Sequence, residues 1–120
     1  MVKYEIHELK TMEAKTPKEL FEKMLPVRFK PEKTAGIDVV AQLIIISVKV
    51  DNWVVIIKDQ KLQVSEGITS SPTLTLKIAE NDFMDIVNGK LSTEKAFFTG
   101  KIDFEGKLSL ALKLKDAGFL

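Results

Sequence analysis

The feature that most constrains the fold is a long run of branched apolar residues between Ile37 and Val50. Such a run is too apolar for a half-exposed helix and is typical of a β-strand. Its most apolar part, Val39 to Val48, is ten residues long and contains Gln42 and Ser47, whereas a membrane span needs about twenty apolar residues. The run therefore predicts a strand that is covered on both faces.

Four further strands are predicted around this one. Asp51-Asn52 is a candidate turn into a hairpin partner, and Asp59 to Lys61 is a candidate turn into a third antiparallel strand. After a loop, two more segments alternate between apolar and polar residues, and Gly106 closes the second of them. The predicted strands after the first are 53–58, 62–65, 73–78 and 101–105.

Three helices are predicted from their start and stop signals. In the first, Thr16 is the expected cap, Pro17 the first residue, and Pro26 the approximate end. The second begins near Glu80 or Asn81 and ends before Gly89, with Phe83, Ile86 and Val87 on one face. The third begins at Ser92 or Thr93, carries Phe97 and Phe98, and ends at Gly100.

The two ends of the chain are ambiguous. Residues 1–15 predict either an extra edge strand or a loosely attached arm, because Val2, Tyr4 and Ile6 alternate with polar residues. In the segment 107–118 the leucines alternate as in a strand, although a helical stripe of Leu108, Ala111 and Leu112 also fits. The local pattern slightly favours a strand there.

Composition limits the class of protein. A length of 120 residues predicts one domain, 1–120, and 45% hydrophobic residues are enough for its core. Lysine and arginine number 18 and aspartate and glutamate 17, so no strong field attracts nucleic acid. The absence of cysteine excludes disulfides, thiolate catalysis and zinc sites built on sulfur.

Candidates for catalysis are few. His7 is the only histidine, and Ser65, Ser70 and Ser71 lack a histidine or lysine at a spacing that would activate them. Asp82 and Asp85 lie three residues apart on a predicted helix, where acids more commonly face water and offset the helix dipole. No glycine-rich phosphate loop is present. The sequence therefore predicts no enzyme, no metal site and no cofactor.

The segment from Phe83 to Leu112, in the last third of the chain, is rich in apolar side chains, and two interpretations of them are open. In the first, these residues only fill the core, which is the more common role of aromatic pairs on short helices. The other interpretation follows from spacing. Asn81-Asp82-Phe83, Gly89-Lys90, Ala96-Phe97-Phe98, Gly100-Lys101, Gly106 and Ala111 with Lys113-Leu114 together resemble the second half of the sterol carrier protein type 2 domain.

That resemblance covers about residues 17–118 and implies a fold and a function. The implied fold is α/β (α+β), a five-stranded, mostly antiparallel sheet covered on one face by helices, with an apolar tunnel between the two layers. The last segment is then a helix, against the local preference. The implied function is non-catalytic binding and transfer of fatty acids, fatty acyl-CoA or sterol-like lipids. The residues that would border the tunnel are Phe83, Ile86, Val87, Phe97, Phe98, Leu108, Ala111 and Leu112.

The expected partner is thus a small hydrophobic ligand, with no nucleic acid and no stable membrane insertion. Lys90, Lys101 and Lys113 are candidates for attracting a lipid carboxylate or phosphate. The alternative is a protein-interaction module with a collapsed cavity, which forms a homodimer through a sheet edge or the last segment. The charged first residues and the final Ala117-Gly118-Phe119-Leu120, which is no peroxisomal address, lead us to expect a cytoplasmic protein.

Overall fold

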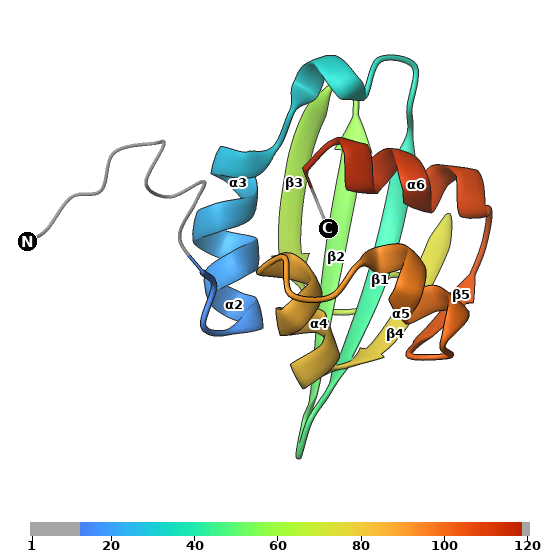
Figure 1. Ribbon diagram of the computed structural model, residues 1–120. Helices are drawn as coiled ribbons and strands as arrows, with labels where there is room; N and C mark the ends of the chain where they lie inside the picture. The colour runs from blue at the N-terminus through green and yellow to red at the C-terminus, as the bar shows by residue number, and fades with distance from the viewer. Residues whose placement is uncertain (1–12, 119–120) are drawn as a thin grey trace, which may run out of the picture.

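A five-stranded mixed sheet forms the centre of the computed structural model, which describes residues 13–118 (Figure 1). The strands lie in the order β3-β2-β1-β4-β5, and all pairs are antiparallel except β1 with β4. The helices within residues 13–118 lie on one face of the sheet. The predicted strand or arm at 1–15 falls largely on residues 1–12, outside the described residues. The strand bounds are Val39–Ile46, Val50–Lys58, Lys61–Glu66, Leu74–Ala79 and Ile102–Glu105 for β1 to β5.

The first hairpin turns earlier than the sequence predicts. β1 ends at Ile46, and the backbone N–H of Ser47 donates to the Lys49 carbonyl at 2.8 Å. The predicted turn at Asp51-Asn52 is wrong, because those two residues pair with β1 inside strand β2. Aspartate and asparagine favour turns, but here pairing within the sheet outweighs that local preference.

The second hairpin turns at Asp59 and Gln60, as the sequence predicts. Both residues have positive φ angles, 52° and 61°, which is the backbone of a type I′ turn. This turn matches the right-handed twist of the strands that it joins, so β2 and β3 pair directly from Lys58 and Lys61 onward.

The polar Gln42, inside the apolar run, anchors a loop across the face of the sheet opposite the helices. Its amide nitrogen donates to the carbonyls of Trp53 and Gly67, at 3.2 and 3.0 Å. Its side-chain oxygen accepts the N–H of Thr69 at 2.8 Å. Helices thus cover one face of β1, and a loop covers part of the other. This loop leads into β4, which pairs parallel to β1.

The first helix continues past Pro26, contrary to the prediction that it ends there. It consists of α2 (Pro17–Glu19), a π-helical turn (Leu20–Met24) and α3 (Leu25–Arg28). In the π turn the N–H of Leu25 donates to the carbonyl of Leu20, five residues back. Proline lacks an N–H and crowds the carbonyl four residues earlier, and the wider turn accommodates both effects. The predicted cap at Thr16 is confirmed, since its hydroxyl accepts the N–H of Glu19 at 3.1 Å. A short 3-10 turn, Pro31–Lys33, follows this helix.

Two short helices follow β4. The first, α4 (Glu80–Val87), has Ala79 at its cap position and no side-chain cap, so the predicted capping by Glu80 or Asn81 is wrong. The second, α5 (Thr93–Phe98), is capped by Ser92, whose hydroxyl accepts the N–H of Lys95 at 3.0 Å, as predicted.

The last described element, α6 (Leu108–Asp116), is a helix. The local preference for a strand is therefore wrong, and the helix that the family resemblance implies is confirmed. A strand would turn all four alternating leucines to one side. In the helix, Leu114 is buried against the core, Leu110 is half-buried, and Leu108 and Leu112 lie one turn apart on a more exposed face.

An aromatic stack joins the helical layer to the sheet. The ring of Phe21 lies 4.8 Å from Trp53 on β2 and 5.6 Å from Phe83 on α4, measured between ring centroids. Phe21 and Phe83 are fully buried. This stack and the inward residues of β1, β2 and β4 form one continuous core.

Candidate functional site

An apolar pocket lies where α5 and α6 cover β4 and β5. Its volume is about 170 Å³. Glu94 is the only charged residue among those that line it. The lining residues are Leu76, Thr93, Glu94, Phe97, Phe98, Ile102, Phe104, Leu108, Ala111 and Leu112.

Three side chains of the sheet form the floor of this apolar pocket. Ile102 and Phe104 alternate along β5, so both point to the helical side, and Leu76 of β4 pairs with Phe104. The acids of β5, Asp103 and Glu105, occupy the alternate positions and point to the other face of the sheet. The strand pattern therefore keeps carboxylates away from the floor.

Helix α5 contributes two consecutive aromatic residues. Phe97 is half-buried and meets Phe104 edge to face, with 6.5 Å between ring centroids. Phe98 follows about 100° further around the helix, meets Phe97 edge to face at 5.8 Å, and remains 83% exposed. One ring thus lies within the pocket wall and the other at its rim.

Helix α6 forms the opposite wall through Leu108, Ala111 and Leu112, which share one helical face. The small side chain of Ala111 leaves room between the two leucines. An ion pair between Lys115 and Glu94 connects α6 to α5. The hydrogen bond from Lys115 lowers the pKa of the Glu94 carboxyl below its ordinary value.

The structure brings together five of the eight residues predicted to border a tunnel. Phe97, Phe98, Leu108, Ala111 and Leu112 all line the apolar pocket. The other three do not line it. Phe83, Ile86 and Val87 lie on the buried face of α4 in the core, where Phe83 stacks on Phe21.

The sequence pattern does not identify the floor of the pocket. Leu76, Ile102 and Phe104 were visible as inward residues of alternating strands, but nothing in that pattern separates core residues from pocket residues. The distinction depends on how far α5 and α6 stand from the edge of the sheet, and this distance is a property of the tertiary structure.

The three predicted headgroup lysines do not line the apolar pocket. Lys101 pairs with Asp82 at 3.2 Å, and Lys90 pairs with Glu13 at 3.4 Å. Lys113 is exposed on α6. The ion pair of Asp82 also fits its expected position on a solvated helix face.

The implied tunnel is not shown over residues 13–118. Pockets for small molecules have volumes from roughly 300 Å³ upward, so 170 Å³ holds only part of a long acyl chain. A complete lipid would require the pocket to widen, and α5 and α6 are the walls that would have to separate.

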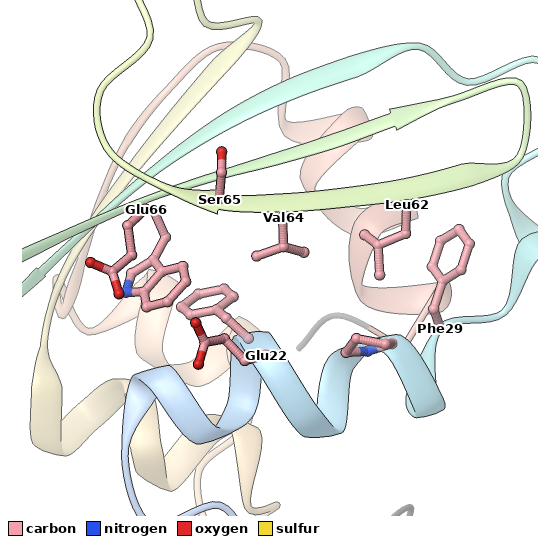
Figure 2. Close-up of a pocket in the computed structure, with 9 residues that line it drawn as sticks. Glu22, Phe29, Leu62, Val64, Ser65 and Glu66 are labelled. Carbon is pink, nitrogen blue, oxygen red and sulfur yellow. The ribbon is translucent and has the colours of Figure 1, made fainter.

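A second, larger pocket of about 510 Å³ lies between the first helix and strand β3 (Figure 2). Figure 2 shows Leu62 and Val64 pointing from β3 toward the helix, and Phe29 lies at one end. Glu22 and Glu66 lie at the other end, and within residues 13–118 neither forms an ion pair. Their carboxylates would repel an anionic lipid headgroup, so this pocket suits a fatty acid less well than the apolar pocket does.

Groups for other chemistries are scarce in the described part of the chain. His7, the one histidine, lies outside it. Within residues 13–118, no three side chains of the metal-binding types His, Cys, Asp and Glu are grouped so that they could hold an ion. No helix over the same residues is long and apolar enough to cross a membrane.

Comparisons with known proteins agree with the resemblance in the sequence. The pattern of the SCP-2 sterol transfer family matches residues 21–117. Sterol carrier protein 2 of Homo sapiens is 34% identical over 64 residues, and peroxisomal multifunctional enzyme type 2 of Mus musculus is 36% identical over 64 residues. The matched region covers 53% and 52% of this chain but only 12% and 9% of those proteins.

Solved structures share the fold. The solution structure of palmitated SCP2L2 from Aedes aegypti is 28% identical, with a TM-score of 0.61 over 84% of this chain and 92% of that one. The sec-alkylsulfatase Pisa1 from Pseudomonas sp. reaches a TM-score of 0.75 at 18% identity, over 85% of this chain and 16% of that one. At that identity the likeness concerns the fold alone.

Proposed function

The chain belongs to the SCP-2 sterol transfer family, and on that premise we propose that it binds an acyl lipid in the apolar pocket between α5, α6 and the sheet edge. Membership in the family suggests lipid binding and transfer in general. The observation that carries the finer proposal is the pocket lining, in which apolar side chains from two helices and two strands converge and the one carboxylate is already paired with Lys115.

The hydrophobic effect is sufficient for such binding. Each methylene removed from water contributes roughly 0.8 kcal/mol, so a long acyl chain can gain about ten kcal/mol before association costs are deducted. Because the lining is almost entirely apolar and its one carboxylate is paired with Lys115, selectivity would depend on the length and shape of the acyl chain. The palmitated relative from Aedes aegypti supports an acyl chain as ligand.

Widening of the pocket is part of the proposal. Helices α5 and α6 are short, with six and nine residues, and among the described residues the only ion pair that joins them is Glu94 with Lys115. A ligand that separates the two helices replaces contacts between side chains with contacts to its own methylenes. The exposed positions of Phe98 and Leu112 provide additional surface for the remainder of the chain.

We also propose that the protein acts without catalysis and that fatty acids or fatty acyl-CoA are its ligands. The chemistry of the pocket supports this proposal, because its only ionisable side chain is a glutamate whose pKa is lowered by a hydrogen bond from a lysine. A glutamate in that state is a poor general acid at neutral pH. Location in the cytoplasm stays a prediction.

A block inside the pocket tests the proposal. Ala111→Phe places a ring between Leu108 and Leu112 and is expected to lower affinity for a fluorescent fatty acid at least about tenfold, because it fills the space that the acyl chain needs. The matched control is Ser109→Phe, on the same helix but outside the pocket lining. Equal affinities of the two variants, both folded by circular dichroism, would place the ligand elsewhere.

The alternative function, an interaction module with a collapsed cavity, is favoured by one observation, the small volume of the pocket. It predicts no saturable binding of fatty acids of any chain length. It also predicts a homodimer whose population rises with protein concentration in sedimentation velocity. The same titration and the same sedimentation run therefore decide between the two functions.

A further inference from the structure

The larger pocket between the first helix and strand β3, which we call the β3 pocket, has no part in the proposed function (Figure 2). Its volume of about 510 Å³ lies within the range of roughly 300–1,000 Å³ in which small-molecule sites fall. Phe29, Leu62 and Val64 are half-buried and make one end of this pocket apolar. That end offers a surface to the hydrocarbon part of a ligand.

The opposite end of the β3 pocket is acidic. Glu22 and Glu66 lie there, and no lysine, arginine or histidine of residues 13–118 lines the pocket. Over the same residues, neither carboxylate forms an ion pair or a hydrogen bond. Two negative charges without a positive counterpart in the lining attract a cation.

Trp53 adds a hydrogen-bond donor beside these acids. It is 3% exposed, lines both the β3 pocket and an adjoining pocket, and lies directly opposite Glu66 in the pairing of β2 with β3. In the part of the chain that the structure describes, its indole N–H has no acceptor. The indole nitrogen is not one of the buried polar atoms that lack a partner, so it is reachable from these pockets. The acidic end therefore also has a donor for a ligand oxygen.

A π-helical turn shapes the same end of the pocket. Phe21 and Glu22 are consecutive residues of the π turn Leu20–Met24, and both line the pocket together with Pro26. Phe21 is fully buried, whereas Glu22 is exposed. Single π turns within α-helices are frequent at functional sites. The distortion that accommodates Pro26 thus also places a carboxylate at the pocket.

Lysines near the β3 pocket do not cancel its charge. The adjoining pocket is lined by Lys18 and Lys49, but also by Asp51, Glu66 and Glu80. Lys49 already pairs with Asp51, at 3.8 Å between Nζ and Oδ1. The acids that line the two pockets therefore outnumber the lysines.

We propose that the β3 pocket binds a long-chain amino alcohol. The ammonium group lies against Glu22 and Glu66, the neighbouring hydroxyl oxygen accepts the N–H of Trp53, and the alkyl chain packs on the apolar end. A fatty acid is disfavoured in this pocket, because its carboxylate would face two others. The protein thus has two sites that select hydrocarbon ligands of opposite headgroup charge, and this second site does not depend on the proposed function.

The fluorescence of Trp53 reports on this site directly, because Trp53 is the only tryptophan of the chain. The probe is 1-amino-2-dodecanol, titrated below its micelle concentration, and we expect a saturable change in emission. Dodecanoate, which has the same chain length, should bind this site at least about tenfold more weakly, because the carboxylates repel its headgroup. Equal affinities of the two compounds overturn the proposal.

Dodecylamine tests the role of the hydroxyl group. It keeps the ammonium and the chain but offers the N–H of Trp53 no acceptor, so it should bind about threefold more weakly than the amino alcohol. An equal affinity of dodecylamine contradicts the hydrogen bond and overturns the assignment to an amino alcohol.

The double variant Glu22→Gln with Glu66→Gln tests the acidic end. Its affinity for the amino alcohol should fall roughly 25-fold, about fivefold for each carboxylate at a few ångströms from the ammonium. The matched control is Glu32→Gln with Glu105→Gln, which makes the same change in net charge at two exposed acids outside both pockets. Equal losses in the two double variants, both folded by circular dichroism, would reduce the effect to net charge and overturn the site.

A fluorescent fatty acid separates this site from the apolar pocket. Neither Glu22 nor Glu66 lines the apolar pocket, so the double variant should bind the fatty acid as the wild-type protein does. An equal loss of both ligands in that variant overturns the distinct site. If the wild-type protein binds the amino alcohol but no fatty acid, the proposed function fails and this site stands. Binding of the fatty acid without the amino alcohol has the opposite meaning.

Discussion

The side-chain oxygen of Gln42 accepts the backbone N–H of Thr69 at 2.8 Å, which fixes the loop between β3 and β4 to the central strand. Gln42 is buried, and its amide nitrogen also serves two carbonyls. We expect Gln42→Leu to lower the free energy of unfolding by about 1–3 kcal/mol, because buried groups lose their partners. Urea denaturation measures this. Gln63→Leu, at an exposed position of β3, should change it by less than about 0.5 kcal/mol, and a loss as large there would contradict the anchoring role.

Replacing Phe83 should affect stability alone, whereas replacing Phe97 should affect both stability and ligand affinity. Phe83→Ala removes a fully buried ring from the aromatic stack and should cost about 3–5 kcal/mol of stability, with unchanged fatty-acid affinity per folded molecule. Phe97→Ala should weaken ligand uptake at least about tenfold as well as stability, because its ring forms a pocket wall. Denaturation curves and ligand titrations on both variants make the comparison. Unchanged affinity in Phe97→Ala would assign that ring to the core alone.

The ion pair between Glu94 and Lys115 should be visible in the titration of the Glu94 carboxyl. Its pKa in the folded protein is lowered, chiefly by the hydrogen bond from Lys115, so the pair stabilises the fold above the ordinary pKa of glutamate. That contribution is lost as the pH falls through the lowered value. Lys115→Met should raise the pKa of Glu94, as followed by the side-chain carbon shift in NMR. Lys113→Met on the same helix is the control, and an equal rise there would exclude Lys115 as the specific cause.

Gly118 should tolerate a side chain less well than Gly36. Both have positive φ angles, 96° and 73°, so either substitution by alanine strains the backbone by about 1–2 kcal/mol. A Cβ at Gly118 would in addition collide with the carbonyl oxygen of Arg28, whereas the space around Gly36 is open. Thermal denaturation should therefore show a larger decrease in Tm for Gly118→Ala than for Gly36→Ala. Equal decreases in Tm would mean that the segment at Gly118 can move away from Arg28 at little cost in free energy.

Most of the fold was predictable because local and tertiary preferences agree. The branched residues of β1, the alternation in β4 and the cap at Ser92 all lead to the elements that the structure contains. The failures occur where a local signal competes with packing. Asp51 and Asn52 favour a turn, yet they pair with β1 inside strand β2. Pro26 favours a helix end, yet the preceding π turn lets the helix continue through it.

The pocket was only half predictable. The family resemblance placed Phe97, Phe98 and three residues of α6 at a cavity, and these five side chains line the apolar pocket. The resemblance also placed Phe83 there, and in the structure this side chain is buried in the core, because helical periodicity marks a buried face without saying what that face covers. The floor residues required knowledge that β5 lies next to β4 at the sheet edge.

The parallel pairing of β1 with β4 has a consequence for the order of folding. Strands β1 to β3 are joined by tight turns. By contrast, the hydrogen bond from the Val40 N–H to the Thr73 hydroxyl, at the start of the β1–β4 pairing, joins residues 33 positions apart. Closing the longer loop costs more chain entropy, so we expect the hairpins to form first and β4, β5, α5 and α6 to join later. Amides of β5 and α6 should then exchange with deuterium faster than those of β1 and β2. The elements around the pocket would be the ones that open most readily while the rest of the sheet stays intact.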